Sequence, residues 1–168
     1  MADVFLGLGS NEGNREDNIR RALVLLGNDD RIEIMAVSSL YETKPMGESN
    51  QPDFINCVVR IKTDYSPQEI FTIAKSIEIT LGREPHTHML PRPMDVDILL
   101  YDDIDLDLLD LRIPHSRLTE RRFVLEPLLE IDRDVIHPIT SRPLAESLEE
   151  VKSQKVIKRT DSSEVWNE

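Results

Sequence analysis

Two aspartates, Asp95 and Asp97, are the strongest candidates for chemistry in this sequence. They open the segment DVDILLY, which is typical of a buried strand, and they follow the proline-rich stretch REPHTHMLPRPM. Residues i and i+2 of a strand point to one face, so both carboxylates would project together. Hard oxygen ligands about 6–7 Å apart suit one or two Mg²⁺ ions shared with a polyphosphate. The alternative is a pair of solvated carboxylates at a strand end, and the pair alone leaves this open.

Arginines stand close to these aspartates along the chain. Arg83 and Arg92 bracket the proline-rich stretch, and Arg121 and Arg122 follow a Pro-His turn. Arginines placed in loops suggest a phosphate clamp, because a guanidinium group binds phosphate oxygens in bidentate fashion. Taken singly, each is better explained by an ion pair with one of the many surface acids. Only the set of arginines beside paired aspartates carries the hypothesis.

Other motifs give weaker evidence of a function. The segment 7–13, GLGSNEG, has its third glycine one residue late for a dinucleotide fingerprint, and a tight strand-to-helix turn explains it. His86 and His88 lack a nearby third ligand for zinc. The acidic run 102–107 lacks the glycine and the final glutamate of a calcium loop. Cys57 is the single cysteine, so an internal disulfide is excluded.

Apolar periodicity and turn residues predict the elements that must position these side chains. Helices are expected at 15–27, at 66–81, within 113–131 and at 141–150; strands are expected at 3–9, 31–43, 54–62, 95–101 and 155–159, with a short one across LDLL. This order predicts an α/β sandwich with a mostly antiparallel sheet, related to the split βαβ arrangement. The loops 44–53 and 83–94 are long, and long loops are often functional.

Length and charge limit the possible functions. The chain has 168 residues and a formal net charge of −12, which fits one globular domain and argues against a nucleic-acid partner. The acidity does not exclude one small anionic ligand held by a local arginine cluster. The sequence has no stretch of about 20 apolar residues and no basic, apolar leader, so we expect no membrane span and a cytoplasmic location.

Considered together and in order, the motifs resemble those of 6-hydroxymethyl-7,8-dihydropterin pyrophosphokinases of the folate pathway. The resemblance spans residues 4 to about 140. It rests on Gly9-Ser10-Asn11-x-Gly13, Ser38-Ser39-x-Tyr41-x-Thr43-x-Pro45, Gln51-Pro52-Asp53-Phe54-x-Asn56, Pro91-Arg92-x-x-Asp95-x-Asp97-Ile98-Leu99, Ile113-Pro114-His115 and Arg121-x-Phe123-x-Leu125-x-Pro127-Leu128.

The resemblance implies transfer of diphosphate from ATP to the pterin hydroxymethyl group, with release of AMP. It implies a three-layer α/β/α domain of ferredoxin-like type and two Mg²⁺ ions that bridge the triphosphate. We expect one domain over residues 1–160, a frayed tail over 161–168, and a monomer, with a dimer left open. ATP and the dihydropterin would be the partners.

The resemblance also assigns roles. Asp95 and Asp97 would hold the metals, and Arg83, Arg92 and Asp97 would be catalytic. The pterin would contact Thr43, Pro45, Met46, Phe54, Asn56 and Phe123, and ATP would contact Glu78, Arg83, Arg92, Ile98, Arg112, His115 and Arg121.

The stretch 83–93 departs from the family pattern. Only Arg83 and Arg92 remain of its arginines, and His88 and Met89 stand where an Arg-Trp pair would be expected. Two alternatives follow: a diphosphokinase with a different pterin acceptor, or a pterin- or nucleotide-binding protein without turnover. Retention of both Asp95 and Asp97 argues against the second, because ligand storage would not need two metals.

Overall fold

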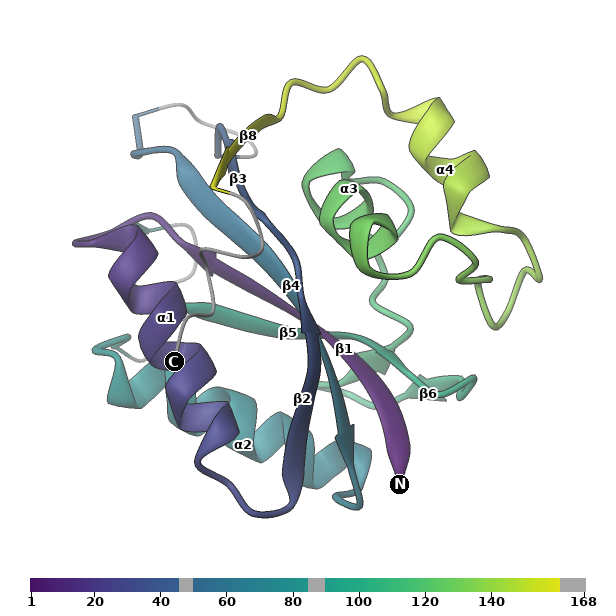
Figure 1. Cartoon of the computed structure of the whole chain (residues 1–168), viewed down its shortest axis with the longest axis horizontal. Helices are drawn as coiled ribbons and strands as arrows, with labels where there is room; N and C mark the ends of the chain where they lie inside the picture. The colour runs from purple at the N-terminus through teal and green to yellow at the C-terminus, as the bar shows by residue number, and fades with distance from the viewer. Residues whose placement is uncertain (46–49, 85–89, 161–168) are drawn as a thin grey trace.

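The computed structural model describes residues 1–45, 50–84 and 90–160, and its centre is an antiparallel sheet (Figure 1). The strand order is β5-β1-β4-β3-β8, and β2 pairs with another part of β4. The strands are β1 (Ala2–Ser10), β2 (Ile32–Val37), β3 (Leu40–Thr43), β4 (Phe54–Thr63), β5 (Asp95–Tyr101) and β8 (Ile157–Thr160), and a separate hairpin joins β6 (Leu106–Asp107) to β7 (Arg112–Ile113).

Helices cover both faces of the sheet. α1 (Arg15–Gly27) and α2 (Pro67–Thr80) lie on one face, and α3 (Arg122–Ile131) and α4 (Leu144–Glu150) lie on the other (Figure 1). Two apolar clusters fill the spaces between these layers, one beneath α1 and α2 and one beneath α3 and α4. The predicted three-layer α/β/α sandwich is confirmed, and the path β1-α1-β2-β4-α2-β5 is the ferredoxin-like one.

Local signals place the first two helices where the sequence predicts them. The Asn14 side chain caps α1 by accepting from the Asp17 backbone N–H. Ser66 and Glu69 form a capping box at α2, with Pro67 at the first helical position. No described helix is both long enough and apolar enough to span a membrane.

One predicted strand is divided. The expected strand 31–43 breaks at Ser38 and Ser39 into β2 and β3, which pair with different halves of β4. The Ser38 hydroxyl accepts from the Val58 backbone N–H at 2.9 Å, so a side chain takes over one backbone pairing at the break. Apolar residues stand on both sides of Ser38 and Ser39, so the sequence pattern alone does not reveal the break. The predicted tail, 161–168, lies outside the described residues.

Candidate active site

Three neighbouring strands place the candidate residues in rows across the sheet. Gly9 of β1 lies opposite Asn56 of β4 on one side and opposite Asp95 of β5 on the other. Gly7 lies opposite Asp97 in the same way. A Cβ atom at Gly9 would come within 3.2 Å of the Asn56 Oδ1 atom. Glycine therefore keeps the middle of the row open between the amide and the carboxylate.

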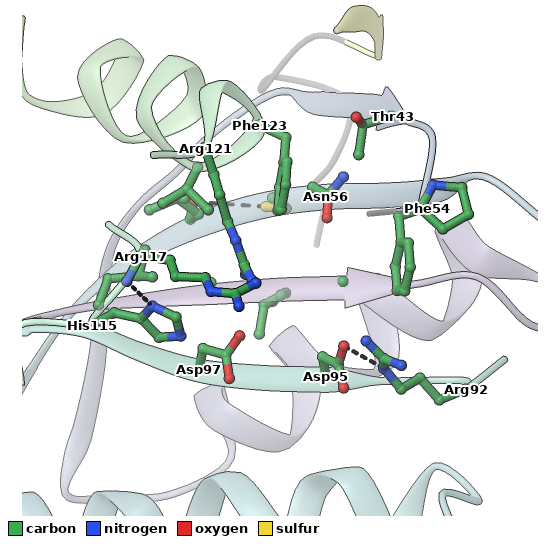
Figure 2. A pocket seen from close by; sticks show the side chains of 18 of the residues that line it. Thr43, Phe54, Asn56, Arg92, Asp95, Asp97, His115, Arg117, Arg121 and Phe123 are labelled. Carbon is green, nitrogen blue, oxygen red and sulfur yellow. Dashed lines mark hydrogen bonds and ion pairs between the residues drawn. The ribbon is translucent and has the colours of Figure 1, made fainter. Parts of the chain in front are cut away.

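A cavity of about 560 Å³ lies above these rows. Its walls come from β1, β3, β4, β5, the turn at 115–117 and the start of α3. Figure 2 shows Phe54 and Asn56 toward one end and His115 and Arg121 toward the other, with the two aspartates along the floor. The cavity thus has an aromatic end and a basic end, joined by carboxylates. Asp97 stands nearer the basic end.

Arginines hold Asp95. The Arg92 Nε atom donates to its carboxylate at 2.5 Å, and Arg83 pairs with its other oxygen. Arg83 also lies 3.3 Å from Glu78, which is 3% exposed and accepts from the Val96 backbone N–H at 2.9 Å. Burial raises the pKa of Glu78, partly offset by that hydrogen bond. Glu78 therefore fixes both Arg83 and the strand between the two aspartates.

Backbone contacts fix Arg92 as well. The buried Asn11 side chain accepts from the Arg92 N–H at 2.8 Å and donates to Gln51 at 3.1 Å. It thereby ties the proline-rich stretch to the loop before β4. The sequence predicts only a tight turn at Asn11. The structure shows that its side chain also links two loops through these hydrogen bonds.

Asp97 is the carboxylate at the centre of the cavity. It makes no hydrogen bond or ion pair with another side chain in the described parts of the chain. Burial, followed by the negative charge of Asp95, raises the pKa of Asp97. A cation placed between two such carboxylates relieves both costs.

The donor set fits Mg²⁺. Within residues 1–45, 50–84 and 90–160 there is no cluster of three or more histidine, cysteine or acidic side chains that could hold a metal. Mg²⁺ binds typically through one or two carboxylates, with substrate phosphates and water as its other ligands. Asp95 and Asp97 on one strand face supply that number, and the cavity leaves room for the rest.

The basic end is built on the turn after Pro114. His115 accepts at Nδ1 from the Arg117 backbone N–H at 3.1 Å, which fixes its ring. Burial lowers the pKa of His115, and the charge of Asp97 opposes this shift. Arg121, at the start of α3, has a buried Nε atom with no hydrogen-bond partner among the described residues. Its guanidinium lies 5.5 Å from the centre of the Phe123 ring.

The aromatic end presents two rings and one amide. Phe54 and Phe123 lie on either side of the Asn56 side chain in Figure 2. The Asn56 Nδ2 atom is buried and has no hydrogen-bond partner in the described part of the chain. Unpaired buried donors are costly, so this atom is suited to a ligand acceptor. Thr43 and Pro45 complete this wall.

Several predicted residues lie elsewhere. Glu78 is beneath Arg83 rather than on the cavity wall, and the Ile98 side chain is buried in the core on the α1–α2 face. Arg112 pairs with Asp105 at 3.0 Å in the β6–β7 hairpin. Met46, His86 and His88 fall outside the described residues.

The phosphate-clamp hypothesis was wrong for Arg122. Its side chain pairs with Glu126 and donates to the backbone carbonyls of Lys152 and Gln154, because it leaves α3 on the side away from the cavity. Arg117, for which the sequence predicts no role, lines the cavity instead. Its position two residues after His115 on the same turn was the available signal.

Comparison with known proteins gives one consistent result. A model of the 7,8-dihydro-6-hydroxymethylpterin-pyrophosphokinase family matches residues 5–133. A 2-amino-4-hydroxy-6-hydroxymethyldihydropteridine pyrophosphokinase of Aquifex aeolicus is 43% identical over 87% of this chain and 90% of its own length. The Bacillus subtilis protein of the same name is 41% identical, over 82% of this chain and 83% of its own.

Longer proteins also match. The folic acid synthesis protein fol1 of Schizosaccharomyces pombe is 41% identical over 91% of this chain, which spans 21% of that protein. The crystal structure of wild-type Plasmodium falciparum HPPK-DHPS with pteroate has a TM-score of 0.73 at 16% identity. It covers 90% of this chain, which spans 42% of that one, and at this identity the likeness concerns the fold.

Proposed function

Because the chain belongs to the 7,8-dihydro-6-hydroxymethylpterin-pyrophosphokinase family, we propose that it transfers diphosphate from ATP to 6-hydroxymethyl-7,8-dihydropterin. The hydroxymethyl oxygen attacks the β-phosphorus of ATP. The bond from that phosphorus to the oxygen bridging the α-phosphorus breaks, and AMP leaves with the electron pair. The hydroxyl group loses its proton in the same reaction.

A single observation carries this proposal: one cavity holds an aromatic and amide end, a basic end, and a carboxylate pair between them. A flat heterocycle with a hydrogen-bonding edge suits the first end, because aromatic faces stack and an amide both donates and accepts. A polyphosphate suits the second end. The order of the three groups would place the hydroxymethyl group of the pterin beside the phosphates, above Asp95 and Asp97.

At the aromatic end, Phe54 and Phe123 would stack on the pterin ring. The Asn56 Nδ2 donor, which has no partner among the described residues, would bind an acceptor on the ring edge. The wall at Thr43 and Pro45 would limit the size of the heterocycle. Positioning of this kind is the main protein contribution to phosphoryl transfer.

At the centre, Asp95 and Asp97 would hold Mg²⁺. The metal, when bound, neutralises charge on the phosphates and orients them. Asp97 has no protein partner in the described residues, so it would be the carboxylate that helps to remove the hydroxyl proton. Arg92 lines the cavity beside Asp95 and would also bind phosphate oxygens as charge develops, whereas Arg83 is not among the lining residues and would act by holding Asp95.

The test is AMP release from ATP and Mg²⁺, measured with and without 6-hydroxymethyl-7,8-dihydropterin. We expect AMP only when the pterin is present, loss of AMP with a chelator, and recovery when Mg²⁺ is restored. Absence of AMP, or AMP formed equally without the pterin, would refute the proposal.

The cytoplasmic location, the monomeric state and the single domain over 1–160 stay predictions.

A matched pair of variants tests the centre. Asp97→Asn should lower turnover by about 100-fold or more, since the loss of roughly 3 kcal/mol of transition-state stabilisation has that effect. Pterin binding, followed by fluorescence, should change little, because the aromatic end is intact. Asp103→Asn removes an exposed carboxylate just beyond β5 and should match the wild type. Equal turnover in all three proteins would remove Asp97 from the mechanism.

A further inference from the structure

Arg117 lies at the basic end of the cavity, and the proposed reaction as described above does not use it. It lies on the turn that carries His115, is exposed at the cavity mouth, and lines the cavity. In Figure 2 its side chain extends past His115 toward Arg121 and Asp97. The turn holds its backbone, because its N–H donates to His115 Nδ1 and the next residue, Leu118, donates to the His115 carbonyl at 3.0 Å.

Two guanidinium groups therefore share one end of the cavity. The positive charge of Arg117 lowers the pKa of Arg121, second in effect only to burial. It also acts to lower the pKa of His115. Like charges that line the same end of one cavity are unfavourable unless an anion lies between them.

The chain itself supplies too little compensating charge there. Across the described ranges, neither Arg117 nor Arg121 forms an ion pair, whereas Arg83 and Arg92 are paired with Asp95. Asp97, Glu120 and Asp95 each act to raise the pKa of Arg121, but none of them forms an ion pair with it in the described ranges, and the charge of Asp97 is disfavoured by burial. In a protein with 32 acidic residues, two neighbouring arginines without a carboxylate partner in the described part of the chain indicate a site for a multivalent anion.

We propose that Arg117 binds phosphate oxygens of ATP together with Arg121, as a paired-guanidinium site at the mouth of the cavity. This inference rests on the proposed function for the identity of the anion. Phosphate is the ligand that the geometry favours, because one polyphosphate can accept from two guanidinium groups and still reach the carboxylate pair. Arg121 would bind from the buried side and Arg117 from the exposed side, which would make Arg117 the first of the two to meet an incoming nucleotide.

The test compares ligands with and without the terminal phosphates. Binding of α,β-methylene-ATP with Mg²⁺, which cannot be turned over, and binding of AMP are measured by calorimetry on the wild type, Arg117→Ala and Arg117→Lys. We expect Arg117→Ala to weaken binding of the triphosphate analogue by about tenfold, which is typical of one charge-assisted contact, and to leave AMP within about twofold. Arg117→Lys should recover part of the loss, because it keeps the charge without the bidentate geometry.

Arg133→Ala is the control, since Arg133 is exposed and lies outside the cavity. It should leave both affinities unchanged, and all variants should keep the wild-type melting temperature. Unchanged triphosphate affinity in Arg117→Ala, or an equal loss for AMP or in Arg133→Ala, would overturn the inference. So would a wild type that does not bind the analogue. A wild type that binds the analogue but releases no AMP from ATP in the presence of the dihydropterin would refute the proposed function and leave the Arg117 comparison valid.

Discussion

Gln154 offers the sharpest test of how the fold supports the site. The N-terminus of α3 carries Arg121 and Phe123, and its capping residue, Arg121, makes no side-chain cap. Gln154, from the segment between α4 and β8, supplies the missing bond. Its Oε1 atom accepts from the Arg122 backbone N–H at 2.9 Å, and its Nε2 atom donates to the Glu120 carbonyl at 2.8 Å. A residue distant in sequence thus caps the helix that forms one wall of the cavity.

The expected effect of Gln154→Ala follows from these two bonds. Loss of a helix cap lowers the free energy of unfolding by about 1 kcal/mol, and the second, more exposed bond adds roughly 0.5 kcal/mol. The total of about 1–2 kcal/mol corresponds to a drop in melting temperature of roughly 2–8 °C for a domain of this size. Because the cap lies between two cavity-lining residues, Arg121 and Phe123, we also expect the KM values for both substrates to rise more than kcat falls.

Calorimetric melting and steady-state AMP release measure these effects. Gln154→Glu keeps the acceptor for the helix N–H and loses the donor, so it should recover most of the stability and the KM values. Gln68→Ala, on the exposed side of α2, removes an amide that makes no hydrogen bond in the described structure and serves as the control. A Gln154→Ala protein with wild-type melting and wild-type KM values would refute the capping argument.

Three further variants test other parts of the molecule. Gly9→Ala should raise the KM for the pterin with little change for ATP, because the new Cβ would press on Asn56 Oδ1; an equal rise for both substrates would contradict this. Leu125→Ala, at a fully buried position in α3, should lower the free energy of unfolding by about 2–5 kcal/mol, and denaturant titration showing less than 1 kcal/mol would be inconsistent with the packing. Burial acts to raise the pKa of Glu130, but the bonds from the Ser39 N–H and the Tyr41 hydroxyl outweigh it and lower that pKa below 4.5. The charged form of Glu130 therefore stabilises the fold above pH 4.5. The difference in unfolding free energy between wild type and Glu130→Gln should shrink as the pH falls below that value. A difference that does not change with pH would show that the charge is unimportant.

The sequence by itself determined the features that depend on spacing along the chain. Strand alternation placed Asp95 and Asp97 on one face, and the structure has them there because β5 runs straight through both. The caps at Asn14 and at Ser66 predicted where two helices begin, since each cap bonds within its own turn. The order and spacing of the motifs were also sufficient to identify the family, and the match to the family model confirms it.

Tertiary structure decided the features that depend on which elements become neighbours. Sequence spacing could not tell that the expected strand at 31–43 divides at Ser38, because the division reflects pairing with two parts of β4. It could not assign the arginines either: an arginine side chain is long, and its partner depends on the face from which it leaves its element. Arg122 donates a hydrogen bond to the Gln154 carbonyl, while Arg117 lines the cavity.

The position of Glu78 outside the cavity also depends on which elements become neighbours. Its helical position is predicted correctly, and its helix contacts β5, so its carboxylate reaches the Val96 backbone and Arg83 instead of the cavity. Local chemistry along the chain determines which side chains share a face. Only the register of β1 between β4 and β5, set by the packing of both layers, decides that Asn56, Gly9 and Asp95 form one row.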